Sequence, residues 1–450
     1  MSPPTHAGTF LHRAAGSVRI ARAMLAARRF ASADGDTIRR AQERRVAEIV
    51  RHAFDTVPYY RDLARRLGCD PRDLRTAADL ARLPLIGRRE LQEHPELFLS
   101  EACPPWMRLE VRSGGSSGAP RGVWHDAASV LDDAGNGERH WAILRRLAGK
   151  QRFRTMTIGS PRNSESDVRA FVRRHAVVPA PVSRAGAAYD MTVAPEDVAR
   201  AVVAARPDVV LGYGSYLERV AQLLDESHGP AAVPRVFAYS GDAMSPSGRA
   251  RIVERLGATV WTAYQAVESL KIGWQCAHGA GLHVHADLCA VRVVDADGRD
   301  VAPGGRGEVV ISNLVDHATV LLNYRLGDEV EVPAAPCGCG VPLPLIGFPE
   351  GRVEDWLVVP SGERVYTQRL RACFTDEREV WQYQLVQERP SSLRVALVAA
   401  EQADRAVLAN RVGRAIAGIV GPGVAVAVQF VRELERTAAG KVRAVIRHDG

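Results

Sequence analysis

The first clear pattern in the chain is a helical repeat of apolar side chains between residues 37 and 57. Apolar residues recur there every three or four positions and the pattern ends at Pro58, as expected of a helix with one buried face. The apolar positions are Ala41, Val46, Ile49, Val50, Ala53, Phe54 and Val57. Short helices interrupted by prolines are expected from there to about residue 112.

From about residue 154, short apolar runs alternate with segments of helical periodicity. The expected strands are residues 209–213, 236–240 and 259–264, and the expected helices are residues 166–175, 196–205, 216–225 and 247–256. Strands and helices that alternate with short loops are typical of a parallel sheet flanked by helices.

After residue 268 the side chains alternate in the manner of strands, with glycine or proline between the runs. Strands are expected at residues 282–294, 308–312 and 329–332. This pattern predicts a small β-rich subdomain over about residues 275–350.

A third region begins at residue 351. Strands are expected at residues 356–359, 364–366, 382–387, 393–399 and 424–431, with a helix at residues 403–420. The first two strands flank Pro-Ser-Gly-Glu, which is typical of a hairpin turn. The predicted fold class is therefore α/β: a large N-terminal domain (residues 1–350) with flanked parallel-type sheets and the β subdomain, then a C-terminal α+β domain (residues 351–450).

The composition narrows the class of protein. The chain has 450 residues, of which 46% are hydrophobic and 25% charged, as in globular proteins large enough for two or three domains. The net charge of +7 would permit nucleic-acid binding, but arginines and acidic residues are interleaved along the chain. We therefore expect no nucleic-acid partner.

Cysteine usage and hydropathy indicate a cytoplasmic protein. Seven irregularly spaced cysteines do not make a disulfide framework. No run of 18 apolar residues occurs, and residues 415–431 are interrupted by three glycines and a proline, so no membrane span is expected. The first 33 residues contain several arginines and no acid, which fits either a transit peptide or, as we favour in so arginine-rich a chain, a peripheral amphipathic helix.

A glycine- and serine-rich segment, residues 113–122 (SGGSSGAPRG), is the strongest local signal. Backbone N–H groups of such a loop can surround a polyphosphate. Hydroxyls come from Ser113, Ser116 and Ser117, and Gly115 and Gly118 allow a close backbone approach. It is not a Walker loop, because no Gly-Lys-Ser/Thr follows, and a simple linker is the alternative reading.

A second signal lies near the C-terminus, where residues 437–443 read TAAGKVR. Its lysine, Lys441, is one of only three among 59 lysines and arginines, with Lys150 and Lys271. A lysine is a compact charge on a flexible stem, which suits a residue that must approach and leave a site.

Three further segments follow the glycine-rich segment in a fixed order: residues 264–268 (YQAVE), 324–328 (YRLGD) and 351–355 (GRVED). Together the five segments resemble the adenylate-forming superfamily of acyl-CoA ligases and adenylation domains. More narrowly they resemble the phenylacetate-CoA ligase branch and its capsular-polysaccharide-biosynthesis relatives. Residues 52–61 (HAFDTVPYYR) also have the character of that branch. The resemblance extends from about residue 40 to about residue 446.

The resemblance implies an ATP-dependent enzyme. A carboxylic acid, expected to be aromatic, would be activated as its acyl-adenylate with release of pyrophosphate and then transferred to a thiol, with CoA as the leading acceptor. An amine acceptor, or transfer of AMP itself to a small molecule, remains an alternative. Two further alternatives are an inactive relative that serves as a binding or scaffold protein, and a zinc-ribbon nucleic-acid binder.

The same resemblance assigns roles to the nucleotide-binding residues. Tyr264 would stack on adenine and Glu268 would hold Mg²⁺, which prefers one or two carboxylates together with phosphate oxygens. Ser240 and Gly241 end a neighbouring strand on the expected same edge of the sheet, where ligands of open α/β sheets bind. Gln265 stands where the family has glycine, and Gly114 replaces a hydroxyl residue of the phosphate loop.

The remaining roles concern the ribose and the moving domain. Asp328, expected in a turn after a strand, would accept the ribose hydroxyls, and Arg352 would donate to the ribose or a phosphate. Glu354 occupies the hinge position, where aspartate or lysine is more usual. Lys441 would bridge the acid's carboxylate and the α-phosphate, so the C-terminal domain is expected to be mobile.

A separate hypothesis concerns a metal. Cys337 and Cys339 lie in a Pro/Gly-rich loop, and with Cys276 and either His283 or His285 they supply the sulfur and nitrogen ligands of a tetrahedral structural Zn²⁺. His283 matches the family position better. The remaining cysteines, Cys69, Cys103, Cys289 and Cys373, are interpreted as small core residues.

Overall fold

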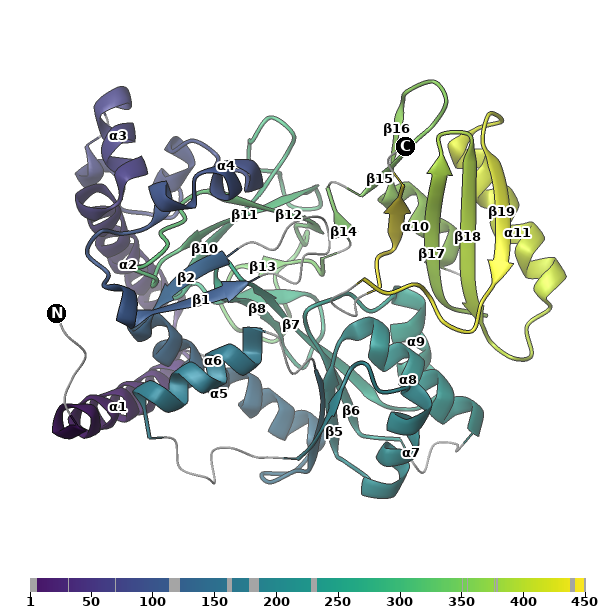
Figure 1. The fold of residues 1–450 in the computed structure, drawn as a ribbon, viewed down its shortest axis with the longest axis horizontal. Coiled ribbons are helices and arrows are strands. Elements are labelled where there is room, and N and C mark those ends of the chain that lie inside the picture. Colours follow the sequence, from purple (N-terminus) through teal and green to yellow (C-terminus); the bar gives the residue numbers. More distant parts are fainter. Residues whose placement is uncertain are drawn as a thin grey trace. The chain divides into compact units, whose positions relative to one another are not determined.

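The computed structural model describes residues 6–30, 32–68, 70–112, 122–159, 164–177, 186–227, 233–349, 351–353, 355–375, 377, 379–437 and 442–448. The chain divides into two compact units (Figure 1). Unit 1 comprises Met1–Arg146, Pro161–Arg184 and Ala263–Phe348; unit 2 comprises Leu147–Ser160, Ala185–Thr262 and Pro349–Gly450.

Unit 1 begins with helices and ends with antiparallel strands. Its helices are α1 (His6–Phe30), α2 (Gly35–Thr56), α3 (Pro58–Leu67), α4 (Arg88–Glu93), α5 (Ala127–Ala148) and α6 (Ser164–His175), with short 3₁₀ turns at Pro71–Asp73, Asp79–Arg82, Pro95–Phe98 and Pro105–Met107. Its strands are β1 (Arg108–Arg112), β2 (Gly122–Asp126), β8 (Leu270–Gln275), β9 (Leu282–Val284), β10 (Cys289–Val294), β11 (Arg306–Asn313), β12 (Tyr324–Glu331) and β13 (Leu345–Ile346).

The strands of unit 1 form three small sheets. The first sheet is the antiparallel pair of β1 and β2. In the second, β11 pairs antiparallel with both β10 and β12. The third has the strand order β13-β9-β8 followed by the end of β7 (Thr259–Ala266), and all its pairs are antiparallel. One hydrophobic cluster joins α2 and α3 to these strands; it includes Ile49, Tyr60, Val123, Ile272 and Tyr324. The glycine- and serine-rich segment therefore lies between two strands that are paired with each other.

Unit 2 contains the predicted parallel sheet. The strand order is β4 (Ala187–Asp190), β3 (Thr155–Gly159), β5 (Val209–Gly212), β6 (Val236–Tyr239) and the start of β7, all parallel. The helices α7 (Pro195–Ala205), α8 (Gly214–Ser227) and α9 (Pro246–Glu254) pack on it through buried aliphatic residues. The predicted strand–helix alternation and the α/β class are confirmed.

The C-terminal part of unit 2 is an α+β region (Figure 1). Its elements are β14 (Gly351–Arg352), β15 (Trp356–Val358), β16 (Arg364–Tyr366), α10 (Thr367–Thr375), β17 (Val380–Arg389), β18 (Ser392–Ala399), α11 (Arg405–Val420), β19 (Ala425–Phe430) and β20 (Val445–Arg447). The sheet order is β19-β18-β17-β20. α11 packs on this sheet through Leu408, Val412 and Ile416, and β15 pairs with β16 as the predicted hairpin.

Two sequence predictions about strands are wrong. Residues 282–294 form two strands rather than one, because the backbone turns between them: the Leu288 N–H donates to the His285 carbonyl at 2.7 Å. Asp328 lies inside β12 rather than in a turn after a strand. Gly327 before it has φ of 81°, so a glycine that resembles a turn signal is accommodated within a strand.

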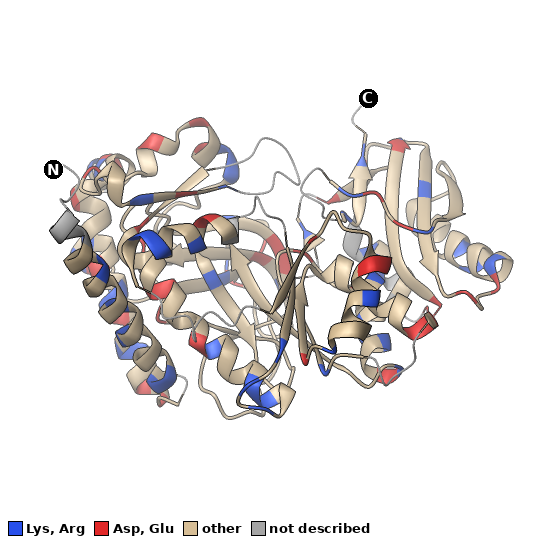
Figure 2. Ribbon diagram, turned by 60° about the horizontal axis from the view of Figure 1, so that its bottom comes forward, with Lys and Arg blue, Asp and Glu red and all other residues tan. Residues whose placement is uncertain are grey.

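The charged residues follow the interleaving seen in the sequence. Figure 2 shows both Lys and Arg and Asp and Glu distributed over the two units. Examples are the exposed pair Arg89–Glu93, 2.7 Å apart on α4, and Arg19–Asp132, 2.6 Å apart between α1 and α5. In the part of the chain that the structure describes, no helix combines the length and the apolar character needed to cross a bilayer.

Candidate active site and metal centre

Tyr264 and Asp328 are joined by a hydrogen bond in unit 1. Tyr264 lies near the end of β7 and is 8% exposed. Its hydroxyl donates to Oδ2 of Asp328 on β12 at 2.7 Å. The two residues are 64 positions apart in sequence, and the bond fixes the orientation of a carboxylate beside an aromatic ring.

Glu268 lies in a tight turn between β7 and β8. Its side chain is nearly buried, 4% exposed, and Oε1 accepts a long hydrogen bond of 3.4 Å from the Tyr324 hydroxyl. The Asn313 amide donates to the Glu268 carbonyl at 3.3 Å. The turn itself is closed by the Ser269 N–H, which donates to the Ala266 carbonyl at 3.2 Å.

The backbone on both sides of the Glu268–Tyr324 contact is in an unusual conformation. Among the residues that the structure describes, three that are not glycine have positive φ: Arg206, Leu270 and Asn323. Leu270 follows Glu268 by two positions and Asn323 directly precedes Tyr324. A left-handed conformation costs about 1–2 kcal/mol for an ordinary side chain, and such strain gathers at functional sites. The rest of unit 1 must therefore hold this contact in place.

Gln265 is accommodated without strain. It is exposed, and it lies at a register shift between β7 and β8. Its φ is not positive, so the backbone conformation here does not require a glycine. The replacement of the family's glycine by Gln265 therefore causes no backbone strain.

In unit 2, Ser240 and Gly241 follow directly after β6. The Ser240 N–H donates to the Gly212 carbonyl at the end of β5, 3.1 Å away. Gly241 has φ of 86°, and a Cβ there would lie 2.8 Å from the ring of Tyr213. Asp242, next in the chain, accepts a hydrogen bond from the Ser215 hydroxyl at 2.5 Å.

Tyr213 and Asp242 are residues that sequence reasoning missed. Both lie at the carboxyl ends of parallel strands, where ligands of open α/β sheets bind. The signal for Asp242 was its position after Ser-Gly at a strand end. The Tyr213 ring over Gly241 had no local signal, because 28 positions separate the two residues.

Two further motif segments, residues 351–355 and 437–443, are in contact in unit 2. Arg352 forms part of β14, and its carbonyl accepts a hydrogen bond from the Asp355 N–H at 3.0 Å. The Asp355 carboxylate in turn pairs with Arg443 at 2.9 Å, with the two side chains 13% and 31% exposed. Arg443 is two residues beyond Lys441, so this ion pair joins two of the motif segments found in the sequence, residues 351–355 and 437–443.

Several predicted site residues lie outside the described residues. These are Ser113, Gly115, Ser116, Ser117, Gly118, Glu354 and Lys441. The ends of the glycine- and serine-rich segment are nevertheless fixed, since Arg112 and Gly122 are directly paired across β1 and β2.

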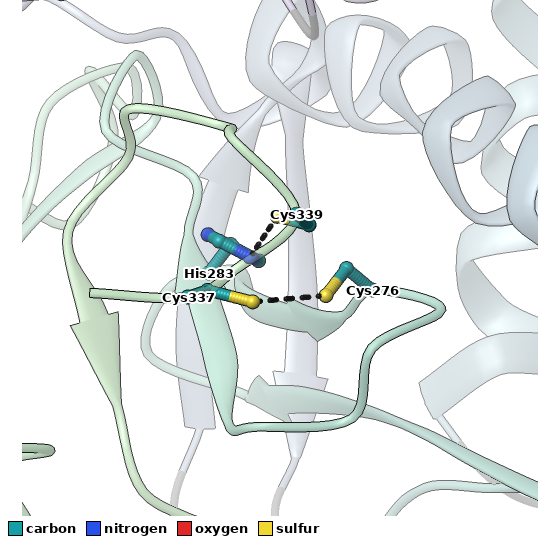
Figure 3. Close-up of side chains that lie close together, drawn as sticks. All are labelled: Cys276, His283, Cys337 and Cys339. Atoms are coloured by element: carbon teal, nitrogen blue, oxygen red, sulfur yellow. Dashed lines mark hydrogen bonds between the residues drawn. The ribbon is translucent and has the colours of Figure 1, made fainter. Parts of the chain in front are cut away.

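Four potential metal ligands lie together in unit 1 (Figure 3). His283 comes from β9, Cys276 directly follows β8, and Cys337 and Cys339 come from the loop between β12 and β13. The sulfur atoms of Cys276 and Cys337 are 3.4 Å apart, and Sγ of Cys339 is 3.3 Å from Nε2 of His283. All four ligand atoms lie within 4.8 Å of one another.

These ligands fit zinc better than a disulfide or a hard cation. Tetrahedral Zn²⁺ with bonds of about 2.0–2.3 Å places its ligands about 3.5–3.8 Å apart, close to the two distances above. The three cysteines are free of disulfides, and burial lowers the pKa of His283, which keeps its ring neutral and able to bind a metal. His285, the alternative ligand, instead contacts Arg139 Nη1 at 2.7 Å.

The other cysteines have mixed surroundings. Cys103 and Cys289 are buried, as predicted, and burial raises the pKa of both thiols. Cys373 is only partly buried. Cys69 lies outside the described residues.

Comparisons with known proteins agree with this architecture. The CapK C-terminal domain family matches residues 357–448. A phenylacetate-coenzyme A ligase of Thermus thermophilus is 25% identical over 453 residues, which cover 91% of this chain and 96% of that protein. A phenylacetate-coenzyme A ligase of Pseudomonas putida is 23% identical over 73% of each chain.

Solved structures show the same fold. A 2-hydroxyisobutyryl-CoA ligase in the postadenylation state, in complex with R3-HIB-AMP, superimposes with a TM-score of 0.68 at 17% identity, covering 91% of this chain and 89% of that chain. The same kind of enzyme in an open conformation, with 2-HIB-AMP and CoA, gives a TM-score of 0.56. The similarity extends through both units.

Proposed function

Because this chain belongs to the adenylate-forming superfamily, we propose that it activates a carboxylic acid with ATP as an acyl-adenylate and transfers the acyl group to CoA. The observation that carries the proposal is the Tyr264–Asp328 hydrogen bond, with Glu268 in the turn that directly follows Tyr264's strand. This hydrogen bond joins two of the motif segments, residues 264–268 and 324–328. Relatives that match most of the chain are phenylacetate-coenzyme A ligases, so an aromatic acid is the first substrate class to test.

The reaction requires electrostatic stabilisation more than covalent chemistry. A carboxylate must attack the α-phosphorus of a polyphosphate that carries several negative charges, and positioned donors and cations supply most of the rate enhancement in such transfers. A bound Mg²⁺ would neutralise the departing pyrophosphate, and the nearly buried Glu268 carboxylate is the residue that would hold it.

The remaining residues bind and orient. Tyr264 stacks on the adenine, and Asp328, held by the Tyr264 hydroxyl, accepts the ribose hydroxyls. Ser240, Gly241 and the serines of residues 113–117 offer backbone and hydroxyl donors to the nucleotide. Arg352 donates to the ribose or a phosphate. Lys441 approaches to bridge the carboxylate and the α-phosphate, and Glu354 is the hinge that allows the C-terminal region to move.

The test is pyrophosphate exchange into ATP. Purified protein is incubated with ATP, Mg²⁺, labelled pyrophosphate and one acid at a time from aromatic, aliphatic and amino acid panels. We expect exchange that depends on the acid and is fastest with an aromatic one. Exchange with none of them would reject the adenylation activity, whereas exchange restricted to aliphatic or amino acids would reject only the aromatic preference.

A second assay identifies the acceptor. With the best acid, AMP release is measured in the presence of CoA, other thiols and amines. We expect CoA to stimulate AMP release and a thioester to form. Stimulation by amines instead would assign an amide-forming ligase, which uses the same first half-reaction.

We further propose that Cys276, His283, Cys337 and Cys339 hold a structural Zn²⁺ that fastens the loop between β12 and β13 to β8 and β9. Protein purified without chelator should contain about one zinc per chain by elemental analysis. Cys339→Ser should lose most of that zinc and lower the melting temperature, whereas Cys289→Ser, a buried cysteine outside the cluster, should keep its zinc. Wild-type protein free of zinc after such purification would remove the proposal.

A further inference from the structure

A histidine and an aspartate in unit 1 form a completely buried pair. Nδ1 of His125 lies 2.5 Å from Oδ2 of Asp316, and neither side chain has any exposed surface. Nε2 of His125 lies 2.7 Å from the carbonyl oxygen of Val267. A carboxylate and a carbonyl are both acceptors, so the ring faces an acceptor at each nitrogen. This arrangement suits an imidazolium, which donates from both nitrogens.

The electrostatics hold a proton within the pair: burial raises the pKa of Asp316, and the pKa of His125 is raised as well. Burial alone would lower the pKa of His125, but the carboxylate of Asp316 and the carbonyl of Val267 outweigh it, and the pKa is raised above its ordinary value. Other charged groups around the ring are Asp133 on α5 and Asp126, whose carboxylate lies 3.9 Å from His317. Removing one partner from a buried ion pair is strongly destabilising. The pair therefore holds together the segments that carry its two residues and the turn that His125 contacts.

One end of this pair is anchored in β2 and in the loop of residues 313–319. Oδ1 of Asp316 accepts hydrogen bonds from the N–H groups of Asp126 and Ala318 at 3.1 and 3.0 Å. Trp124 and Thr319 exchange two further bonds of 2.9 Å, one of them from the Trp124 N–H to the Thr319 hydroxyl. β2 begins at Gly122, the last residue of the glycine- and serine-rich segment, so its position sets that end of the segment.

The other end of the pair holds the turn that carries Glu268. Val267, whose carbonyl contacts His125, is the residue directly before Glu268. The carbonyl of Glu268 itself accepts from Asn313, and the Asn313 side-chain oxygen accepts from the N–H groups of Val315 and Asp316. Two consecutive carbonyls of the turn are therefore bound to the same group of residues.

We propose that the His125–Asp316 pair is a positioning device that fixes the Glu268 carboxylate relative to the strand that follows the glycine- and serine-rich segment, and so sets the affinity of the site for Mg²⁺. This inference rests on the proposed function, because it takes Glu268 as the residue that holds Mg²⁺. In this role His125 and Asp316, whose side chains have no exposed surface, do not themselves bind the nucleotide or the metal. They act through Val267 and the backbone of the turn.

The test is the Mg²⁺ dependence of ATP binding, measured by calorimetry without any acid. His125→Gln keeps a donor for Val267 but removes the charge, and Asp316→Asn neutralises the other partner. We expect each substitution to raise the Mg²⁺ concentration at half-maximal binding about tenfold, with affinity for ATP in the absence of Mg²⁺ changed less than twofold. The double substitution should have no larger effect than either single one, because both remove the same interaction.

A matched control separates positioning from general stability. His140 on α5 is a partly buried histidine of unit 1, and its Nε2 lies 3.3 Å from Nε2 of His285. His140→Gln should change the melting temperature while leaving the Mg²⁺ midpoint unchanged. If His125→Gln and Asp316→Asn likewise lower only the melting temperature, the pair has a structural role alone and the proposal is wrong.

The pH dependence of the wild-type protein gives a readout that needs no variant. The ring of His125 is charged below its raised pKa. The Mg²⁺ concentration needed for half-maximal ATP binding should therefore increase as the pH rises through that pKa. In Asp316→Asn the same loss should begin at lower pH, because the carboxylate that raises the pKa of His125 is gone. A Mg²⁺ midpoint that does not vary with pH in the wild type would contradict the proposal.

The outcomes also separate this inference from the proposed function. Wild-type protein that binds ATP with Mg²⁺ but exchanges pyrophosphate with no acid would reject the adenylation activity and leave the positioning pair intact. Wild-type protein whose ATP binding does not depend on Mg²⁺ would overturn the positioning role, whatever the exchange assay shows.

Discussion

The turns that follow β6 and β7 belong to the two different units, and they are built in different ways. The turn after β7 carries Glu268 and is held by side chains from distant segments, with Leu270 in a left-handed conformation. The turn after β6 carries Gly241 and is shaped by the backbone, since glycine both adopts a positive φ and leaves room for the Tyr213 ring.

The two turns therefore meet different requirements: the first places a charged group, and the second allows a close approach of the backbone. In the first turn a carboxylate must be placed, so the surrounding structure supports a conformation that the residues themselves disfavour. In the second turn the chain must pass close to an aromatic ring, and the residue type alone makes that possible. Substitutions at the two turns should therefore fail in different assays.

The largest effect is expected at the first turn. Glu268→Gln keeps the size and the hydrogen-bonding acceptor but removes the charge that would hold Mg²⁺. Pyrophosphate exchange should fall at least a hundredfold, about 3 kcal/mol of transition-state stabilisation, with a melting temperature close to that of the wild type. Equal losses of exchange and of stability would show that Glu268 is a structural residue.

The next effect concerns a buried carboxyl beside the second turn. Glu218 on α8 accepts from the Ser245 N–H at 2.5 Å and from the Gln382 side chain at 3.0 Å. Burial raises the pKa of Glu218 to about 7. A raised pKa means that its stabilising contribution is complete below the ordinary value and is lost as the pH rises through about 7, a loss on the order of 3 kcal/mol for a fully buried group.

Denaturant unfolding at pH 5.5 and pH 8 measures this directly. The free energy of unfolding should be lower at pH 8, and Glu218→Gln, which mimics the protonated carboxyl, should remove most of that difference. A Glu218→Gln protein with the wild-type pH dependence would assign the effect to another group.

A smaller effect is expected at Gly241. In Gly241→Ala the alanine would be strained by the positive φ, and its Cβ would clash with the Tyr213 ring. We therefore expect a loss of about 1–2 kcal/mol of stability and weaker ATP binding. Gly257→Ala is the matched control, because Gly257 has φ of 64° but nothing within 4 Å of an added Cβ. If the two variants lose the same stability and both bind ATP normally, the Tyr213 contact does not matter.

Much of the unit 2 sheet was predictable, because its information is local. The helices at residues 196–205 and 216–225 and the strand at 236–240 correspond to α7, α8 and β6 within about two residues. Short apolar runs alternating with helical periodicity specify such elements without knowledge of the fold. The break between β9 and β10 was not predictable, because the turn at residues 285–288 contains neither glycine nor proline.

The contacts that organise the candidate site were harder to predict from the sequence. The segments around Tyr264, Asp328 and the Cys337–Cys339 pair could be found from the sequence, since their residue types and order carry the signal. The His125–Asp316 pair and the Asp355–Arg443 pair join residues separated by 191 and 88 positions. The local sequence around these four residues is not unusual, so only the folded chain reveals the two pairs.

The most direct test of the account compares wild-type protein with Lys441→Ala in two half-reactions. We expect the wild type to exchange pyrophosphate in an acid-dependent manner, and Lys441→Ala to lose this exchange yet still form the thioester when acyl-adenylate and CoA are supplied. Undiminished exchange in Lys441→Ala, or no acid-dependent exchange in the wild type, would contradict this expectation.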